Sequence, residues 1–274
     1  MKRKISKVLI ASICLNAIML LMLCGVAYYK REGIKNRIVK IFTPKNHKIE
    51  QLAIEMNQEV YNPIFGRIGT SDKVIKIAFI GNSLTLHGVS ENIGWTHESG
   101  MAASSLEKDY VHRLIEKIST SKNISVEYGL INTADFERNF INFDNSRLSK
   151  LLEFSPDYVI FQQGENVSSN DIKKQYKLYV EKYSDLIKNF DNSTKIVCLP
   201  FWYDKDKISA ITEVAIKTNS FLVDLSHLGG GLDNRNYAIS EVKYSHKGVG
   251  LHPGDFGMEN ISDNIFSVFN ALIE

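Results

Sequence analysis

Short apolar runs rich in β-branched and aromatic residues recur along the chain from residue 74 onward, and longer polar stretches separate them. Each run is about the length of one buried strand, and each separation is long enough for a helix. This alternation is typical of a parallel sheet with crossover helices. The runs that we interpret as strands are 74–80, 124–131, 158–162, 195–199 and 221–225.

Apolar residues recur at three- and four-residue spacing in three of the separating stretches, which predicts amphipathic helices there. These stretches are 107–118, 170–189 and 258–272. We therefore expect an α/β domain over residues 73–274, with a central parallel sheet of about five strands. In such a sheet ligands bind beyond the carboxyl ends of the strands, so the loops that follow them are the place to look for chemistry.

The N-terminal part has a different pattern. A basic N-terminus, residues 1–7, precedes a run from 8 to 29 that has no charged side chain. A helix of that length spans a ~30 Å hydrocarbon layer, so we interpret 8–29 as a transmembrane anchor. A cleaved signal peptide and a lipoprotein signal are the alternatives, since Cys24 stands near the end of the run. The bulky Leu23 before that cysteine fits a lipoprotein signal less well.

Residues 30–72 are polar and basic, which predicts a stalk between the anchor and the domain. Basic residues flank the apolar run on both sides, so the lysine and arginine rule does not settle its orientation. The basic start followed by an apolar run is typical of export signals, and we expect a single-pass protein with an extracytoplasmic domain. Two of the three cysteines lie inside the apolar run, so no disulfide framework is indicated.

The balance of acidic and basic residues argues against one class of binding partner. With 33 basic and 31 acidic side chains, the formal net charge of +2 provides no field that would favour nucleic acid. We therefore expect no nucleic-acid partner.

The first strand runs directly into the sequence Gly-Asn-Ser-Leu at 81–84. Ser83 thus stands where a nucleophile would, although a serine there also suits a helix cap. A serine hydroxyl needs a neighbouring general base and donors for a developing oxyanion. His252, in a glycine-rich loop before the last expected helix, is the candidate base among seven histidines, and Asn166, after the third strand, is a candidate donor. In isolation, a structural role is the more common one for a serine or a histidine in such a place, and it is as common as a catalytic role for Asn166.

Together these three loops resemble the SGNH, or GDSL-type, hydrolase family over roughly residue 74 to the end. The sequence at 81–84 is similar to the family's nucleophile block with Asn82 in place of the usual aspartate, Gly-Glu-Asn at 164–166 to its Gly-x-Asn block, and Leu-His-Pro at 251–253 to its histidine block. The resemblance implies a flavodoxin-like three-layer sandwich and ester hydrolysis without a metal or organic cofactor. It also implies an oxyanion hole that includes the backbone N–H of Ser83 and the side chain of Asn166.

One departure concerns the acid of the triad, which in this family usually lies three residues before the histidine. That position is Val249. A backbone carbonyl in the loop 245–249, with Val249 as the candidate, is expected to hold the imidazole instead. The alternatives are carboxylates that approach in space, namely Asp255, Glu165 or Glu98. Losing such an orienting group costs about 10⁴ in rate in a triad.

A second departure concerns the family's glycine block. The corresponding segment, 132–138, has no glycine, and the backbone N–H of Ala134 is the candidate replacement donor. Two charged residues close this segment. Glu137 and Arg138 are expected to form an ion pair at the cleft or on the surface, or Arg138 to bind a substrate anion.

A long irregular insertion at 88–105 follows the nucleophile loop and is expected to shape the site. Trp95 within it, and Trp202, suit either stacking on a sugar or burial. The leading hypothesis is a carbohydrate O-acetylesterase or O-acetyltransferase that acts on a cell-surface glycan. A lipase or thioesterase, and a catalytically inactive glycan-binding module, are the alternatives.

Overall fold

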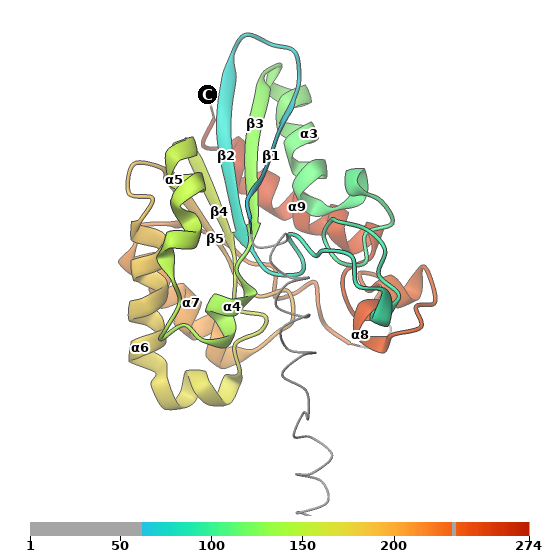
Figure 1. The fold of residues 1–274 in the computed structure, drawn as a ribbon, viewed down its shortest axis with the longest axis vertical. Helices are drawn as coiled ribbons and strands as arrows, with labels where there is room; N and C mark the ends of the chain where they lie inside the picture. Colours follow the sequence, from blue (N-terminus) through green and yellow to red (C-terminus); the bar gives the residue numbers. More distant parts are fainter. Residues whose placement is uncertain (1–61, 232–233, 274) are drawn as a thin grey trace, which may run out of the picture. The chain divides into compact units, whose positions relative to one another are not determined.

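The domain is built around one six-stranded sheet (Figure 1). The computed structural model describes residues 62–231 and 234–273. The strand order is β1-β3-β2-β4-β5-β6, with strands β1 (Ile64–Ile68), β2 (Val74–Gly81), β3 (Ser125–Asn132), β4 (Tyr158–Gln162), β5 (Thr194–Cys198) and β6 (Phe221–Val223). All five strands expected from the sequence are present.

The sixth strand, β1, was not expected. It lies inside the segment 30–72 that we interpreted as a stalk, and it pairs antiparallel with β3 at the edge of an otherwise parallel sheet. Most of its residues are exposed, as on many edge strands, so its sequence lacks the buried apolar run that marks the central strands. The sheet therefore begins upstream of residue 73.

Helices cover both faces of the sheet, which makes the domain a three-layer sandwich. Successive residues of β2 point to opposite faces: Ile77 and Phe79 join one apolar core, and Ala78 and Ile80 join the other. The first core is closed by α3 (Tyr110–Lys122) and α9 (Asp255–Asn270). The second is closed by helices on the other side of the sheet (Figure 1), chiefly α5 (Ser149–Phe154), α6 (Ser169–Lys188) and α7 (Lys205–Lys217).

The three helices expected from the sequence correspond to α3, α6 and α9, with ends shifted by a few residues. Helix α7 was not expected; the side chain of Asp204 caps it by accepting from the N–H groups of Asp206 and Lys207. The remaining helical segments in the described part of the chain are short: α4 (Ala134–Arg138), α8 (Lys247–Gly250) and four 3₁₀ turns at Glu91–Ile93, Leu106–Lys108, Asn145–Leu148 and Ala238–Ser240.

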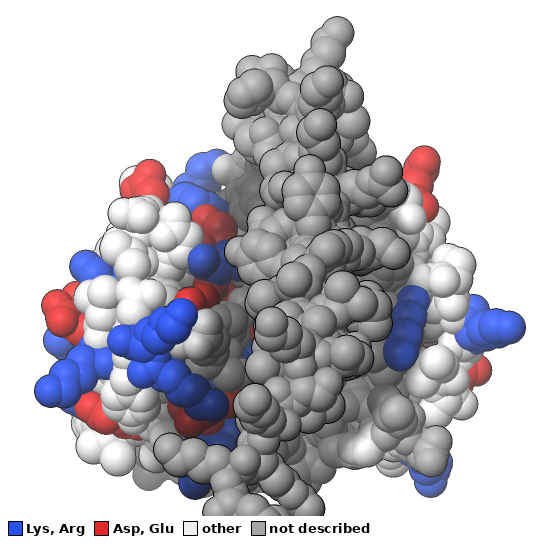
Figure 2. All heavy atoms as spheres, turned by 90° about the horizontal axis from the view of Figure 1, so that it is seen from below, with Lys and Arg blue, Asp and Glu red and all other residues white. Residues whose placement is uncertain are grey.

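The N-terminal predictions fall largely outside the described residues. Within 62–231 and 234–273, no helix is both long and apolar enough to cross a membrane, and the expected anchor at 8–29 is not in those ranges. On the face shown in Figure 2, acidic and basic side chains are interspersed, in keeping with the balanced charge of the sequence.

The sheet brings the chemically interesting loops to one edge. Gly81 at the end of β2 is in register with Asn132 at the end of β3 and with Gln162 at the end of β4. The three strands therefore end level with one another, and the loops that carry Ser83, Ala134 and Asn166 start side by side.

Candidate active site

Ser83 lies in a tight turn directly after β2. The carbonyl of Asn82 accepts from the N–H groups of Thr85 and Leu86, each at 3.0 Å, and the Asn82 side chain accepts from Leu84 N–H at 3.0 Å. A Cβ at Gly81 would lie 1.8 Å from Thr85 Oγ1, so the turn requires glycine there. Ser83 is partly exposed, and its backbone N–H donates to no acceptor within the described residues. The turn therefore presents both the hydroxyl and the N–H of the serine.

His252 meets this serine from the other end of the chain. Its Nε2 lies 3.0 Å from Ser83 Oγ, although 169 positions separate the two residues. Its Nδ1 lies 2.8 Å from the carbonyl oxygen of Gly248, one helical turn earlier in α8. A carbonyl oxygen only accepts, so Nδ1 carries the proton and Nε2 presents its lone pair to the serine hydroxyl. The pair has the distance expected of a nucleophile and its general base.

The surroundings keep this imidazole neutral. The pKa of His252 is lowered to about 4, mainly by burial and to a smaller extent by the charges of His87 and His246, while the hydrogen bond to the Gly248 carbonyl acts in the opposite direction. No carboxylate contributes to this shift. His252 is therefore a proton acceptor at neutral pH.

The group that holds the imidazole belongs to the loop predicted for it, but it is the neighbour of the residue named. The carbonyl of Val249 accepts from the backbone N–H of His252 at 3.0 Å, and the Gly248 carbonyl contacts the ring. The orienting carbonyl is thus that of Gly248, one position before the predicted Val249. The reason is that α8 makes a helical turn that places residue 248 beneath residue 252.

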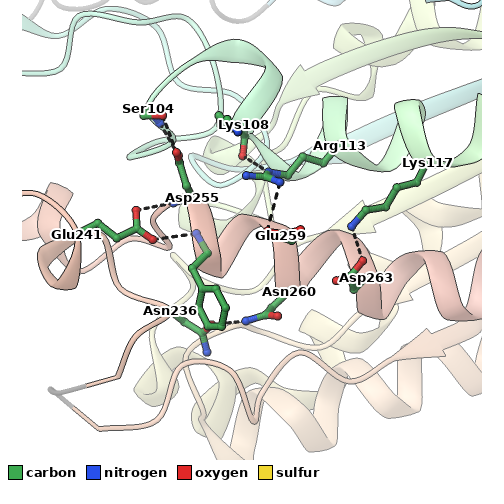
Figure 3. A network of polar contacts seen from close by, with 11 residues as sticks. Ser104, Lys108, Arg113, Lys117, Asn236, Glu241, Asp255, Glu259, Asn260 and Asp263 are labelled. Carbon is green, nitrogen blue, oxygen red and sulfur yellow. Dashed lines mark hydrogen bonds and ion pairs between the residues drawn. The ribbon is translucent and has the colours of Figure 1, made fainter. Parts of the chain in front are cut away.

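The alternative carboxylates lie elsewhere. Figure 3 shows Asp255 pointing to Ser104, whose N–H and hydroxyl donate to its two oxygens at 2.8 and 2.6 Å. Glu98 is exposed, and the carboxyl of Glu165 accepts from Gln162 and from Phe201 N–H. Asp255 is therefore not the orienting group that the sequence suggested. It fixes the start of α9 against the insertion.

The insertion at 88–105 packs against the histidine loop. Trp95, Met101 and Ala102 form an apolar cluster with Ala238 and Val249, in which the Val249 side chain is fully buried. Trp95 is 1% exposed, so of the two roles left open for it the structure shows burial. The position expected to hold a triad acid is thus a packing position.

Polar contacts attach the same insertion to both sides of the Ser–His pair. Met101 N–H donates to the carbonyl of Ser83 at 2.7 Å, and Tyr244 Oη donates to the carbonyl of Ala102 at 3.2 Å. The Glu241 carboxylate accepts from the N–H groups of Asp255 and Phe256 at the start of α9 (Figure 3). The insertion and the C-terminal segment therefore hold His252 opposite Ser83.

Two of the expected oxyanion donors, Asn166 and Ala134, differ in whether they have an N–H left for a substrate. Asn166 is partly exposed, and one of its two Nδ2 protons is donated to Glu137. The N–H of Ala134 instead donates to Asn132 Oδ1 at 2.9 Å, in the turn that leads into α4. This second donor is therefore engaged within its own turn, because the Asn132 side chain folds back over it.

Glu165, between Gly164 and Asn166, is the one carboxyl near the site with a strongly raised pKa. The pKa of Glu165 is raised to about 8, mainly by burial and to a smaller extent by the nearby charge of Glu137, while the hydrogen bond from the N–H of Phe201 opposes the rise. Its Oε2 is buried without a hydrogen-bond partner. Local sequence does not predict this environment, because it depends on the loop after β5.

Trp202 lies beside the base. Its ring centroid is 5.2 Å from that of His252, with the planes at 84°, and it remains partly exposed. Among the described residues, no group of three or more His, Cys, Asp or Glu side chains could hold a metal ion. The candidate site thus consists of the hydroxyl of Ser83, the neutral imidazole of His252 and the amide of Asn166, with the indole of Trp202 at its edge.

Comparison with known proteins agrees with this arrangement at the level of the fold. No protein-family model and no curated protein matches the chain. Among solved structures, a lipase/acylhydrolase from Enterococcus faecalis matches with a TM-score of 0.50 and 16% identity, over 73% of this chain and 97% of that one. The chain has the fold of the SGNH hydrolases.

A two-domain esterase active on acetylated mannans has the same fold over one part of its length. It matches with a TM-score of 0.50 and 17% identity, over 80% of this chain and 52% of that one. The chain therefore spans about half of that esterase. At these identities the SGNH fold is shared, and the chemistry rests on the residues described above.

Proposed function

We propose that this chain is a serine esterase that removes or transfers acetyl groups on a glycan, through Ser83 and His252. The observation that carries the proposal is the 3.0 Å contact between Ser83 Oγ and His252 Nε2, with the far nitrogen of the ring held by the Gly248 carbonyl. A neutral imidazole in this tautomer accepts the serine proton as the hydroxyl attacks.

The reaction proceeds in two half-reactions. Ser83 Oγ attacks the ester carbonyl carbon while His252 Nε2 takes the hydroxyl proton, and the N–H of Ser83 and Nδ2 of Asn166 stabilise the oxyanion. The intermediate collapses, the sugar oxygen leaves with the proton from His252, and acetyl-Ser83 remains. Water, or an acceptor hydroxyl in a transferase, then attacks with His252 again as the base, which releases acetate or the new ester and restores Ser83.

A backbone carbonyl does the orienting work that a carboxylate does in a triad. It holds the Nδ1 proton and the ring plane, but it carries no full charge to stabilise the imidazolium that forms during attack. The low pKa of His252 points the same way. We therefore expect slower turnover than a complete triad would support.

Two observations favour a glycan ester. Trp202 presents a partly exposed indole beside the base, where amphipathic rings suit a sugar face. The two-domain esterase with the same fold acts on acetylated mannans. The apolar segment 8–29 supports our further proposal of a membrane-anchored protein with its domain on the extracytoplasmic side, close to cell-surface polymers.

The test uses the full-length chain, with aryl acetate and acetylated mannan as substrates. We expect acetate release that falls by about 10⁴ or more in Ser83→Ala and in His252→Ala, with the double variant no worse than either. Ser90→Ala, which removes a serine hydroxyl from a neighbouring turn, is the matched control and should keep full activity. Equal turnover by the wild type and Ser83→Ala would contradict the assignment.

Two other outcomes would redirect the proposal. The Enterococcus faecalis protein of this fold is described as a lipase/acylhydrolase, so the acyl specificity is to be measured with esters of increasing chain length. Faster turnover of long acyl chains than of acetate would favour a lipase or thioesterase. Failure of a fluorophosphonate to label Ser83 in the wild type, together with no turnover, would favour an inactive glycan-binding module.

A further inference from the structure

Glu137 is a buried carboxylate that none of the proposed catalytic steps uses. It lies in α4, the short helix after β3, and is 1% exposed. Among the described residues it pairs with no lysine or arginine; its oxygens accept from N–H groups of the Gly-Glu-Asn loop and from Asn82, the residue before the nucleophile. The ion pair with Arg138 that the sequence suggested is not among the described contacts.

The loop after β4 is shaped to surround this carboxylate. Gly164 has a φ of +119°, which turns the chain sharply, and a Cβ there would lie 2.6 Å from Ile211. Three successive backbone N–H groups, from residues 164 to 166, consequently converge on Glu137, those of Glu165 and Asn166 at 3.0 and 3.1 Å. Successive N–H groups of this kind form an anion-binding concavity, here filled from within the chain.

The same carboxylate holds both halves of the candidate site. Oε1 accepts from Asn82 Nδ2 at 3.0 Å, on the nucleophile turn. Oε2 accepts from the Nδ2 of Asn166, the oxyanion donor. One buried side chain thus links the residue beside Ser83 with the amide expected to face its substrate.

The next residue of α4 contacts the opposite end of that amide. Arg138 donates to Asn166 Oδ1 at 3.5 Å, while Glu137 accepts from its Nδ2. A cation at the oxygen and an anion at the nitrogen together select one orientation of the carboxamide. In that orientation one Nδ2 proton is occupied and the other is left for the substrate.

We propose that Glu137, assisted by Arg138, is a positioning residue that fixes Asn166 as the oxyanion donor and ties it to the nucleophile turn. The effect of this positioning on kcat rests on the proposed function, whereas the orientation of the Asn166 amide does not depend on it. In Glu137→Gln, an amide accepts through one atom only, so either Asn166 or the other donors face an NH₂ group. The carboxamide of Asn166 then loses its fixed orientation.

The kinetic test is a double-mutant cycle between residues 137 and 166 in the full-length chain, with aryl acetate as the substrate. Removing an oxyanion donor costs about 10²–10³ in kcat, so we expect Asn166→Ala to lose about that much and Glu137→Gln about 10- to 100-fold, mainly in kcat. Because Glu137 acts through Asn166, adding Glu137→Gln to Asn166→Ala should reduce kcat less than threefold further.

Asp135→Asn is the matched control. Asp135 lies in the same helix, but its carboxylate pairs with Arg147 and does not contact Asn166. It should keep kcat within about twofold. Wild-type activity in Glu137→Gln, or losses that multiply in the double variant, would overturn the inference while leaving the proposed function standing. Should Glu137→Gln fail to fold, the double-mutant cycle is measured between Arg138→Gln and Asn166→Ala instead, because Arg138 is exposed. We expect Arg138→Gln to lower kcat by a few-fold.

A second readout is independent of turnover. The side-chain NH₂ signals of Asn166, assigned by their absence in Asn166→Ala, should be widely separated by the contact with the carboxylate and should draw together in Glu137→Gln. Unchanged signals in that variant would overturn the inference even if the protein proved not to be an esterase. If the wild type neither hydrolyses esters nor is labelled at Ser83, the proposed function fails and this signal alone decides the positioning role.

Discussion

The two sides of the candidate site are held by different physical means. On the histidine side, the ring of His252 is held by an uncharged backbone carbonyl, and its loop by an apolar cluster around Trp95 and Val249. On the oxyanion side, Asn166 lies between a buried carboxylate and a guanidinium. The position expected to carry a negative charge is thus apolar, and the carboxylate is found beneath the opposite loop.

The comparison shows that orientation and charge stabilisation are separable tasks. A carbonyl and good packing suffice to fix a ring and its tautomer, but they do not favour an imidazolium. A carboxylate that accepts several N–H groups fixes a loop rigidly, since hydrogen bonds to charged groups are stronger than neutral ones. We therefore expect the two sides to respond differently to charge, to pH and to substitution.

The largest expected effect comes from placing an acid at the position where the triad would have one. Val249→Asp buries a carboxylate among apolar side chains and should lower the free energy of unfolding by about 3–5 kcal/mol, with no gain in activity. Val242→Asp, at a valine that is 54% exposed, is the matched control and should change stability by less than about 0.5 kcal/mol. Denaturant unfolding measures both, and a more active Val249→Asp would show that the loop can host a triad.

The next effect concerns the pH dependence of the base. His252 must be neutral to accept the proton, and its pKa is lowered to about 4, so kcat/KM should rise with pH through a midpoint near 4. At pH 5 about nine-tenths of the base is then neutral, against about 3% for an ordinary histidine, a difference of about 30-fold. A midpoint near 6.5 in the pH profile would mean that the imidazole is solvated or paired with a carboxylate.

The third effect belongs to Glu165, on the oxyanion side. Its pKa is about 8 in the folded chain and near 4.5 when unfolded, so between these values the folded state binds the extra proton. Stability should therefore fall as pH rises from about 4.5 to 8, and level off above. Glu165→Gln should remove this fall. The stability of the variant minus that of the wild type should therefore increase by more than about 1 kcal/mol between pH 5 and pH 8.

Thermal or denaturant unfolding at the two pH values tests this prediction. Other titrating groups cancel in the difference between the two proteins, because they are common to both. Glu213→Gln, at an exposed surface pair on α7, is the control and should leave the pH dependence unchanged. A parallel pH dependence in the wild type and Glu165→Gln would show that the Glu165 carboxyl is already solvated.

The central strands followed from the local pattern of apolar residues. The layer architecture and the Ser83–His252 pair followed from the resemblance of three loops to the SGNH hydrolases. Buried strands are recognisable because most of their residues are apolar, and strand ends in a parallel sheet converge on one edge. The edge strand β1 escaped prediction because its residues are mostly exposed. The N-terminal anchor remains a prediction, since it lies outside the residues that the structure describes.

What only the tertiary structure decided is which groups support the pair. The identity of the carbonyl behind His252 depends on one turn of α8, and the burial of Val249 depends on Trp95, more than 150 positions away. The role of Glu137 depends on a loop that begins 27 residues later. Apolar periodicity and motif resemblance depend on short segments of a chain; the first indicates the strands, and the second singles out Ser83 and His252. Burial, pKa and hydrogen-bond partnership arise from contacts between distant segments, so the supports of Ser83 and His252 appear only in the folded protein.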